Sequence, residues 1–166
     1  MGRSTKLLGF AVLVGGIVAS APAVFADEHR SKMTCRSVDE GTPQPIGDPE
    51  GRMIVVYDVT CTVVEGSPHG RVYSGNTILE LDNTHASLIA GGGVLRSPGS
   101  IVVTQIIKGD GEATMEAGKV TGFAFSGRSK IIWASSSVVA AMVGKSFSYT
   151  TNSTGPGEFV VDSVAD

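Results

Sequence analysis

Residues 53–64 (MIVVYDVTCTVV) are the segment that most constrains what this chain can fold into. The odd-numbered positions of the segment are all apolar, whereas its even positions include Asp58, Thr60 and Thr62. Alternation with a period of two, in β-branched residues, predicts a strand with one buried and one exposed face. This interpretation places Cys61 on the buried face and Asp58 on the outer one.

Similar apolar runs recur along the chain and are separated by turn residues. The further strands we expect are 33–38, 71–81, 86–96, 101–108, 112–117, 119–125, 128–134, 145–152 and 158–164. Residues 137–143 are compatible with a strand or with one or two helical turns. The Gly-Asp-Gly triplet at 109–111 predicts a hairpin, and the three glycines at 91–93 predict a bulge or a tight bend.

Short strands joined by hairpin-length connections, without a convincing amphipathic helix, indicate an all-β fold. We expect a small antiparallel up-and-down β-barrel of about eight strands, with a β-sandwich as the alternative. Glycines inside strands favour the barrel, because a small barrel must coil its strands sharply. The 166 residues have room for one such domain, which we assign to 53–166. An N-terminal segment with a Pro/Gly-rich loop, 27–52, precedes it.

Residues 1–26 have the pattern of a secretory signal peptide. Arg3 and Lys6 precede an apolar run at 7–19, and small residues lead to a cleavage site after Ala26. A helix of this apolar run is about 20 Å long, shorter than the ~30 Å core of a bilayer. We therefore expect a cleaved signal peptide rather than an anchor, no stable membrane span after cleavage, and export to the periplasm or outside the cell.

Cys35 and Cys61 are the two cysteines of the chain. An exported chain meets an oxidising compartment, so one structural disulfide between them is the expected state. Closing a loop of this length contributes roughly 3–3.5 kcal/mol in the chain-entropy picture. Two buried thiols and a metal pair are the alternatives, although this spacing, with no histidine near either cysteine, is not typical of a metal site.

Composition and motifs exclude several classes of function. The net charge is −3, and without Arg3 and Lys6 eleven basic residues remain against sixteen acidic ones. A nucleic-acid module needs a basic footprint, so nucleic acid is not an expected partner. No phosphate-binding loop, zinc motif, calcium loop or nucleophile elbow is present, and we expect no metal and no cofactor. His29, His69 and His85 are too scattered to share a metal, and we expect them to be solvated.

The aromatic residues concentrate late in the chain. Phe123 and Phe125 share one strand face, as do Phe147 and Tyr149. These side chains either pack a core or line a cavity, because eight-stranded barrels are either filled or hold one small ligand. Asp58 and Arg128 are further cavity candidates, as polar groups, if their side chains point inward.

The C-terminal half resembles the allene-oxide-cyclase and dirigent superfamily of barrels. The resemblance rests on GDGEATMEAGKVTGFAFSG (109–127) and VVAAMVGKSFSYTT (138–151), in which Val143, Gly144 and Phe147 fit the family's turn near the end of the chain. It implies an eight-stranded antiparallel barrel with a cavity for an apolar small molecule, often in dimers or trimers. No segment matches the family's catalytic residues, so the resemblance implies no site residues here.

Three functions remain open. The first is an exported barrel that binds an apolar or amphipathic small molecule in its interior. The second is a cofactor-free isomerase or cyclase that uses the same cavity, with Asp58, Tyr73, Arg128 or Tyr149 as its polar groups. The third is a structural or interaction protein with a filled barrel and no ligand, which could be a homo-oligomer. Whether the protein is an enzyme is left open by the sequence.

Overall fold

The computed structural model describes residues 30–39, 41–48, 51–66 and 70–166. The predicted signal peptide, His29 and His69 lie outside the described residues. The elements are β1 (Arg30–Ser37), β2 (Gln44–Pro45), β3 (Met53–Glu65), β4 (Val72–Asp82), β5 (His85–Ser97), β6 (Ser100–Glu116), β7 (Lys119–Ala134), α1 (Ser137–Ala140), β8 (Ser146–Gly155) and β9 (Glu158–Ala165). The described part of the chain is therefore nearly all β, as predicted.

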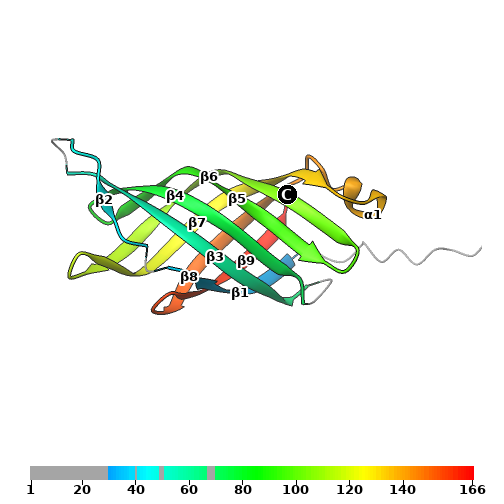
Figure 1. The fold of residues 1–166 in the computed structure, drawn as a ribbon, viewed down its shortest axis with the longest axis horizontal. Coiled ribbons are helices and arrows are strands. Elements are labelled where there is room, and N and C mark those ends of the chain that lie inside the picture. Colours follow the sequence, from blue (N-terminus) through cyan, green and yellow to red (C-terminus); the bar gives the residue numbers. More distant parts are fainter. Residues whose placement is uncertain (1–29, 40, 49–50, 67–69) are drawn as a thin grey trace, which may run out of the picture.

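The strands form a closed antiparallel barrel (Figure 1). From β3 to β9 each strand pairs with the next one along the chain, and β1 pairs with both β9 and β3. This closes an eight-stranded up-and-down barrel, to which β2 adds two residues beside β3. The predicted barrel is confirmed, and because a sandwich would leave β1 without one of its two partners, the alternative is wrong.

The two ends of the barrel differ. One end, the α1 end, holds the start of β1, the end of β3, the β5–β6 turn, helix α1 and the end of β9 (Figure 1). The opposite end, the β2 end, holds β2 and the β4–β5, β6–β7 and β8–β9 turns. The segment 137–143, which the sequence left open between a strand and helical turns, contains the short helix α1 and no strand.

Two expected turns are absent from the described structure. Gly109 and Gly111 lie within the long strand β6, and 119–125 and 128–134 are both parts of β7. Both glycines face the interior, where a methyl group on Gly109 would overlap the ring of Phe125 and one on Gly111 would overlap the carbonyl of Ala124. The Gly-Asp-Gly hairpin prediction was wrong because these glycines provide space for a neighbouring strand, not a change of direction.

A bulge occurs just before the glycine run that predicted one. In the pairing of β4 with β5, Ile78 lies opposite Ala90 and Leu79 lies opposite Leu88, so Ile89 is the extra residue. It lies two residues before Gly91, and a bulge of this kind increases the local coil of the strand. The glycines at 91–93 themselves pair in regular register with residues 75–77, so the bulge lies just before the glycine run rather than within it.

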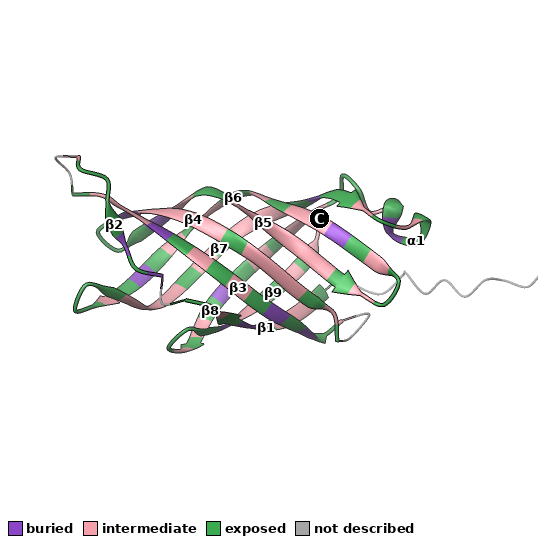
Figure 2. Ribbon diagram, viewed as in Figure 1, coloured by how far each residue is buried: buried purple, intermediate pink, exposed green. Residues whose placement is uncertain are grey.

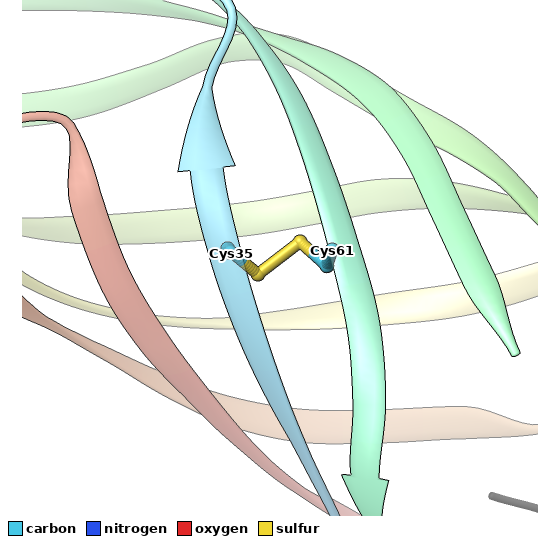
Figure 3. The surroundings of a disulfide bond; sticks show 2 residues. All are labelled: Cys35 and Cys61. Atoms are coloured by element: carbon cyan, nitrogen blue, oxygen red, sulfur yellow. A yellow bond between two sulfur atoms is a disulfide. The ribbon is translucent and has the colours of Figure 1, made fainter. Parts of the chain in front are cut away.

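Strand β1 belongs to the barrel, so the barrel begins at Arg30 rather than at Met53. A disulfide joins Cys35 of β1 to Cys61 of β3, which are directly paired residues with Cα atoms 3.9 Å apart (Figure 3). The predicted disulfide is confirmed. The prediction that 27–52 precedes the barrel is wrong for β1, because a short strand with charged outer residues shows little apolar periodicity of its own.

Alternate residues of each strand point inward, which produces the bands of burial along the strands in Figure 2. Near the β2 end, Val55, Leu81, Ala86 and Ala113 form one buried cluster. In the middle, the disulfide packs against Phe159. At the α1 end, Val139 of α1 packs on Val102 and Ile131, so the short helix covers this end of the interior.

Candidate functional site

Four of the six predicted cavity residues lie on the inner face of the barrel. Phe123, Phe125, Phe147 and Tyr149 alternate in register with inward-facing residues of β7 and β8. Each of the three phenylalanines packs against one of the buried clusters: Phe125 near the β2 end, Phe123 in the middle and Phe147 at the α1 end. The sequence therefore identified aromatic residues of the interior, and the structure distributes them over its full length.

Asp58 and Arg128, the other two candidates, lie on the outer wall. Asp58 is exposed and pairs across strands with Asn76, out of phase with inward-facing Tyr57 and Val59. Arg128 donates hydrogen bonds to Asp166 from Nε at 2.9 Å and from Nη2 at 2.5 Å. Neither residue can line the interior, because strand alternation fixes its side chain outward.

Asp166, the partner of Arg128, also accepts a 2.6 Å hydrogen bond from Ser148. The bond from Ser148 and the adjacent Arg128 guanidinium lower the pKa of this carboxyl. The group is therefore a surface ion pair that ties the end of the described chain to β7 and β8. Its geometry serves to anchor the chain end, not to bind a ligand inside the barrel.

Aromatic rings lie directly against glycines in the middle of the barrel. A methyl group on Gly75 would lie 2.7 Å from the Tyr73 hydroxyl oxygen, and one on Gly127 would lie 2.6 Å from the Tyr149 hydroxyl oxygen. Phe125 covers Gly109 in the same way. These aromatic side chains extend across the interior over the glycine residues of neighbouring strands. They therefore occupy space that a ligand would need.

Tyr73 and Tyr149 are the polar groups of this layer. Burial raises the pKa of Tyr73, although its hydrogen bond with Thr104 partly offsets that effect. Burial also raises the pKa of Tyr149, and the neighbouring Tyr73 raises it further. Both phenols keep their protons at neutral pH, so they can donate hydrogen bonds but cannot act as general bases.

Tyr57 is an inward-facing tyrosine that the candidate set omitted. Burial, with a smaller contribution from Asp39, raises its pKa to about 12, and its buried hydroxyl has no hydrogen-bond partner among the described residues. Gly41, which has a positive φ of 56°, lies against its ring, so the segment after β1 covers Tyr57. The apolar alternation of 53–64 contained the signal for its inward position.

Two hollows of the described surface are open to solvent. One, of about 280 Å³, lies between the segment after β1 and the outer face of β3. The other, of about 450 Å³, is a shallow depression over the outer wall of β3, β4 and β5. Its polar side chains are Asp58, Thr60, Ser74 and Asn76. Neither hollow contains an aromatic platform or paired carboxylates that would favour a particular ligand.

Metal binding finds no support in the described residues. No three histidine, cysteine, aspartate or glutamate side chains lie close enough together there to hold an ion. His85 instead contacts Glu112, its cross-strand partner, at 3.4 Å, and both side chains are exposed. Within the same part of the chain, no helix is long and apolar enough to cross a membrane.

No protein-family model, curated protein or solved structure matches this chain. The function therefore has to be argued from the barrel itself. The disulfide is typical of the oxidising environment that exported proteins meet.

Proposed function

We propose that this chain is an exported interaction protein, in which a filled, disulfide-closed barrel acts as a rigid scaffold and the outer surface contacts the partner. The observation that carries the proposal is the packing of Tyr73, Phe125 and Tyr149 onto glycines in the middle of the interior. A barrel of eight strands has room either for its own side chains or for one small ligand. Here the rings take the central space.

Binding of an apolar small molecule inside the barrel is the competing proposal. The observation in its favour is the inward polar group of Tyr73, Thr104 and Tyr149, which could orient a ligand among the phenylalanines. An isomerase or cyclase would use the same space. One of these tyrosines could be the acid of such an enzyme. Asp58, the candidate carboxylate, and Arg128, the candidate guanidinium, both lie on the outer wall, so the base would have to be another group.

Native mass spectrometry of the mature chain, purified from its export compartment without a reducing agent, tests the proposal. We expect a mass about 2 Da below that of the reduced chain, because disulfide formation removes two hydrogens, and no small-molecule adduct. The same spectrum reports whether the chain is a homo-oligomer.

A bound apolar adduct would contradict the filled barrel if it depended on the interior. The variant Phe147→Ala removes an inward ring, and Val56→Ala is the matched control because Val56 is 43% exposed on the outer wall. An adduct that is lost in Phe147→Ala and kept in Val56→Ala would establish an interior ligand site. The small-molecule proposal would then replace the scaffold proposal.

A further inference from the structure

The charged side chains of the described residues divide along the barrel axis. The α1 end carries eight basic residues and three acidic ones: Arg30, Lys32, Arg71, Arg96, Lys108, Arg128, Lys130 and Lys145, with Glu65, Asp162 and Asp166. The β2 end carries three basic residues and seven acidic ones: Arg36, Arg52 and Lys119, with Asp39, Asp48, Glu80, Asp82, Glu112, Glu116 and Glu158. A chain of net negative charge thus has one strongly basic end.

Exposed apolar side chains gather at the same end. Eight of the thirteen exposed large hydrophobic residues lie there: Val64, Val72, Ile101, Ile132, Trp133, Val138, Val143 and Val164. Trp133 is 51% exposed and Val138, on α1, is 76% exposed. Water-facing apolar residues in such number, next to basic ones, mark a surface that contacts something.

The basic residues around this apolar group are available for contact. Lys32 pairs with Glu65 and Arg128 pairs with Asp166, but Arg96, Lys130 and Lys145 are exposed and form no ion pair with any described residue. Lys130 and Lys145 flank the segment that contains Trp133, Val138 and Val143. We call the set of Arg96, Lys130, Trp133, Val138, Val143 and Lys145 the α1-end surface.

The α1 end is the end of the barrel at which the chain arrives from the predicted signal peptide. Strand β1 begins at Arg30 on the α1 end, four residues after the proposed cleavage site that follows Ala26. The apolar run ends at Ala19, so eleven residues lead from it to Arg30, and they span at most about 40 Å when extended. In a precursor whose apolar run is inserted in a membrane, Arg30 would lie within that distance of the bilayer, and the chain would enter the barrel at the α1 end.

We propose that the α1-end surface docks on the surface of an anionic lipid bilayer, with Lys130, Lys145 and Arg96 facing phosphate headgroups and Trp133, Val138 and Val143 entering the interface. Tryptophan favours this depth of a bilayer, and basic residues near an anionic leaflet each strengthen binding. The inference rests on the proposed function, since a scaffold without an internal ligand acts through its outer surface.

Trp133 is the single tryptophan of the chain, so its fluorescence reports this surface directly. The mature chain, from Asp27, is titrated with vesicles of phosphatidylcholine containing 30% phosphatidylglycerol (a composition of roughly one charge per three lipids, chosen to give a strong surface potential), and with vesicles of phosphatidylcholine alone. We expect a blue shift with the anionic vesicles only. It should disappear as salt rises, because screening shortens the Debye length from about 10 Å at 0.1 M to about 3 Å at 1 M.

Matched charge variants locate the binding. Lys130→Gln/Lys145→Gln should weaken binding at least about tenfold, since each basic residue contributes about fivefold. Arg36→Gln/Lys119→Gln removes the same charge from the β2 end and should leave binding unchanged. Val138→Ser removes an exposed apolar side chain that supports no part of the barrel and should reduce the blue shift.

Three results would overturn the inference: no blue shift with anionic vesicles, equal weakening by the two double charge variants, or self-association without vesicles that Lys130→Gln/Lys145→Gln abolishes. The last result would show that the α1-end surface docks on the acidic end of a second copy. A chain that carries no adduct and ignores vesicles keeps the scaffold proposal and loses this inference. A chain that carries an interior adduct and binds vesicles loses the scaffold proposal and keeps the membrane-docking inference.

Discussion

Cys35 and Cys61 are directly opposite each other on β1 and β3, and their bond fastens the strand that closes the barrel. Strand β1 is short and has charged outer residues, so its two neighbours, β3 and β9, and the disulfide hold it in place. A covalent bond between residues that are 26 positions apart therefore reinforces the strand pairing that closes the barrel.

Removing this bond should destabilise the barrel without opening a large cavity. For Cys35→Ser/Cys61→Ser we expect the free energy of unfolding to fall by about 3 kcal/mol, because the unfolded chain regains the entropy of a closed loop. Urea denaturation followed by Trp133 fluorescence measures the change. The unsubstituted chain in a reducing agent is the control and should show the same loss, and coincident curves with and without the bond would contradict the expectation.

Gly109 should not tolerate a side chain. A methyl group there overlaps the ring of Phe125, so Gly109→Ala should cost about 1–3 kcal/mol through overpacking. Gly122→Ala is the matched control in the next strand, because its methyl group would meet its nearest neighbours at an ordinary 3.7 Å. Denaturant midpoints of the two variants test the contrast.

The source of that cost can be separated from the general effect of losing glycine. Phe125→Leu makes room beside Gly109, so Gly109→Ala/Phe125→Leu should cost less than the sum of the two single changes. Additive costs would show that the ring is not the obstacle and would weaken the packing argument for a filled interior.

The three tyrosines of the chain, Tyr57, Tyr73 and Tyr149, should make the barrel sensitive to alkali. All three have a raised pKa because they are buried, and that of Tyr57 is about 12. Folding favours the neutral phenol, so the stability from these groups is complete below the unfolded pKa of about 10 and is lost as the pH rises toward 12 and above.

Two measurements check this dependence. Absorbance at 295 nm (about the wavelength at which tyrosinate is followed) should show little ionisation at pH 10 in the folded chain and a cooperative rise when the barrel unfolds. Urea midpoints should be level from pH 7 to pH 9 and fall above about pH 10. Ionisation of all three groups near pH 10 in the folded chain would show that solvent reaches the interior.

Helix α1 should contribute to stability through one side chain. Val139 is 4% exposed and packs on Val102 and Ile131, so Val139→Ala should cost about 1–2.5 kcal/mol. Its neighbour Val138 is 76% exposed, and Val138→Ala should change stability by less than about 0.5 kcal/mol. Thermal unfolding of both variants provides the comparison, and equal costs would mean that α1 does not cover the interior.

The sequence by itself predicted the class of fold and which residues of β3 point inward, and it made a disulfide the expected state of the two cysteines. The first two properties depend on local periodicity: the alternation in 53–64 specifies one apolar face wherever the strand is placed. The inward positions of Phe123, Phe125, Phe147 and Tyr149 followed from the same rule. The glycine run indicated an irregularity in this strand, but the bulge lies at Ile89, just before the run, and the glycines themselves pair regularly.

Only the tertiary structure decided the lengths of β6 and β7, the place of β1, and what fills the interior. Gly109 and Gly111 read locally as a hairpin, but the ring of Phe125 and the backbone at Ala124, remote in sequence, make them strand residues. Strand β1 acquires its position from β3 and β9 together, which no local pattern encodes. The basic α1 end likewise exists because antiparallel closure brings residues as distant as Arg96 and Lys145 to one end of the barrel.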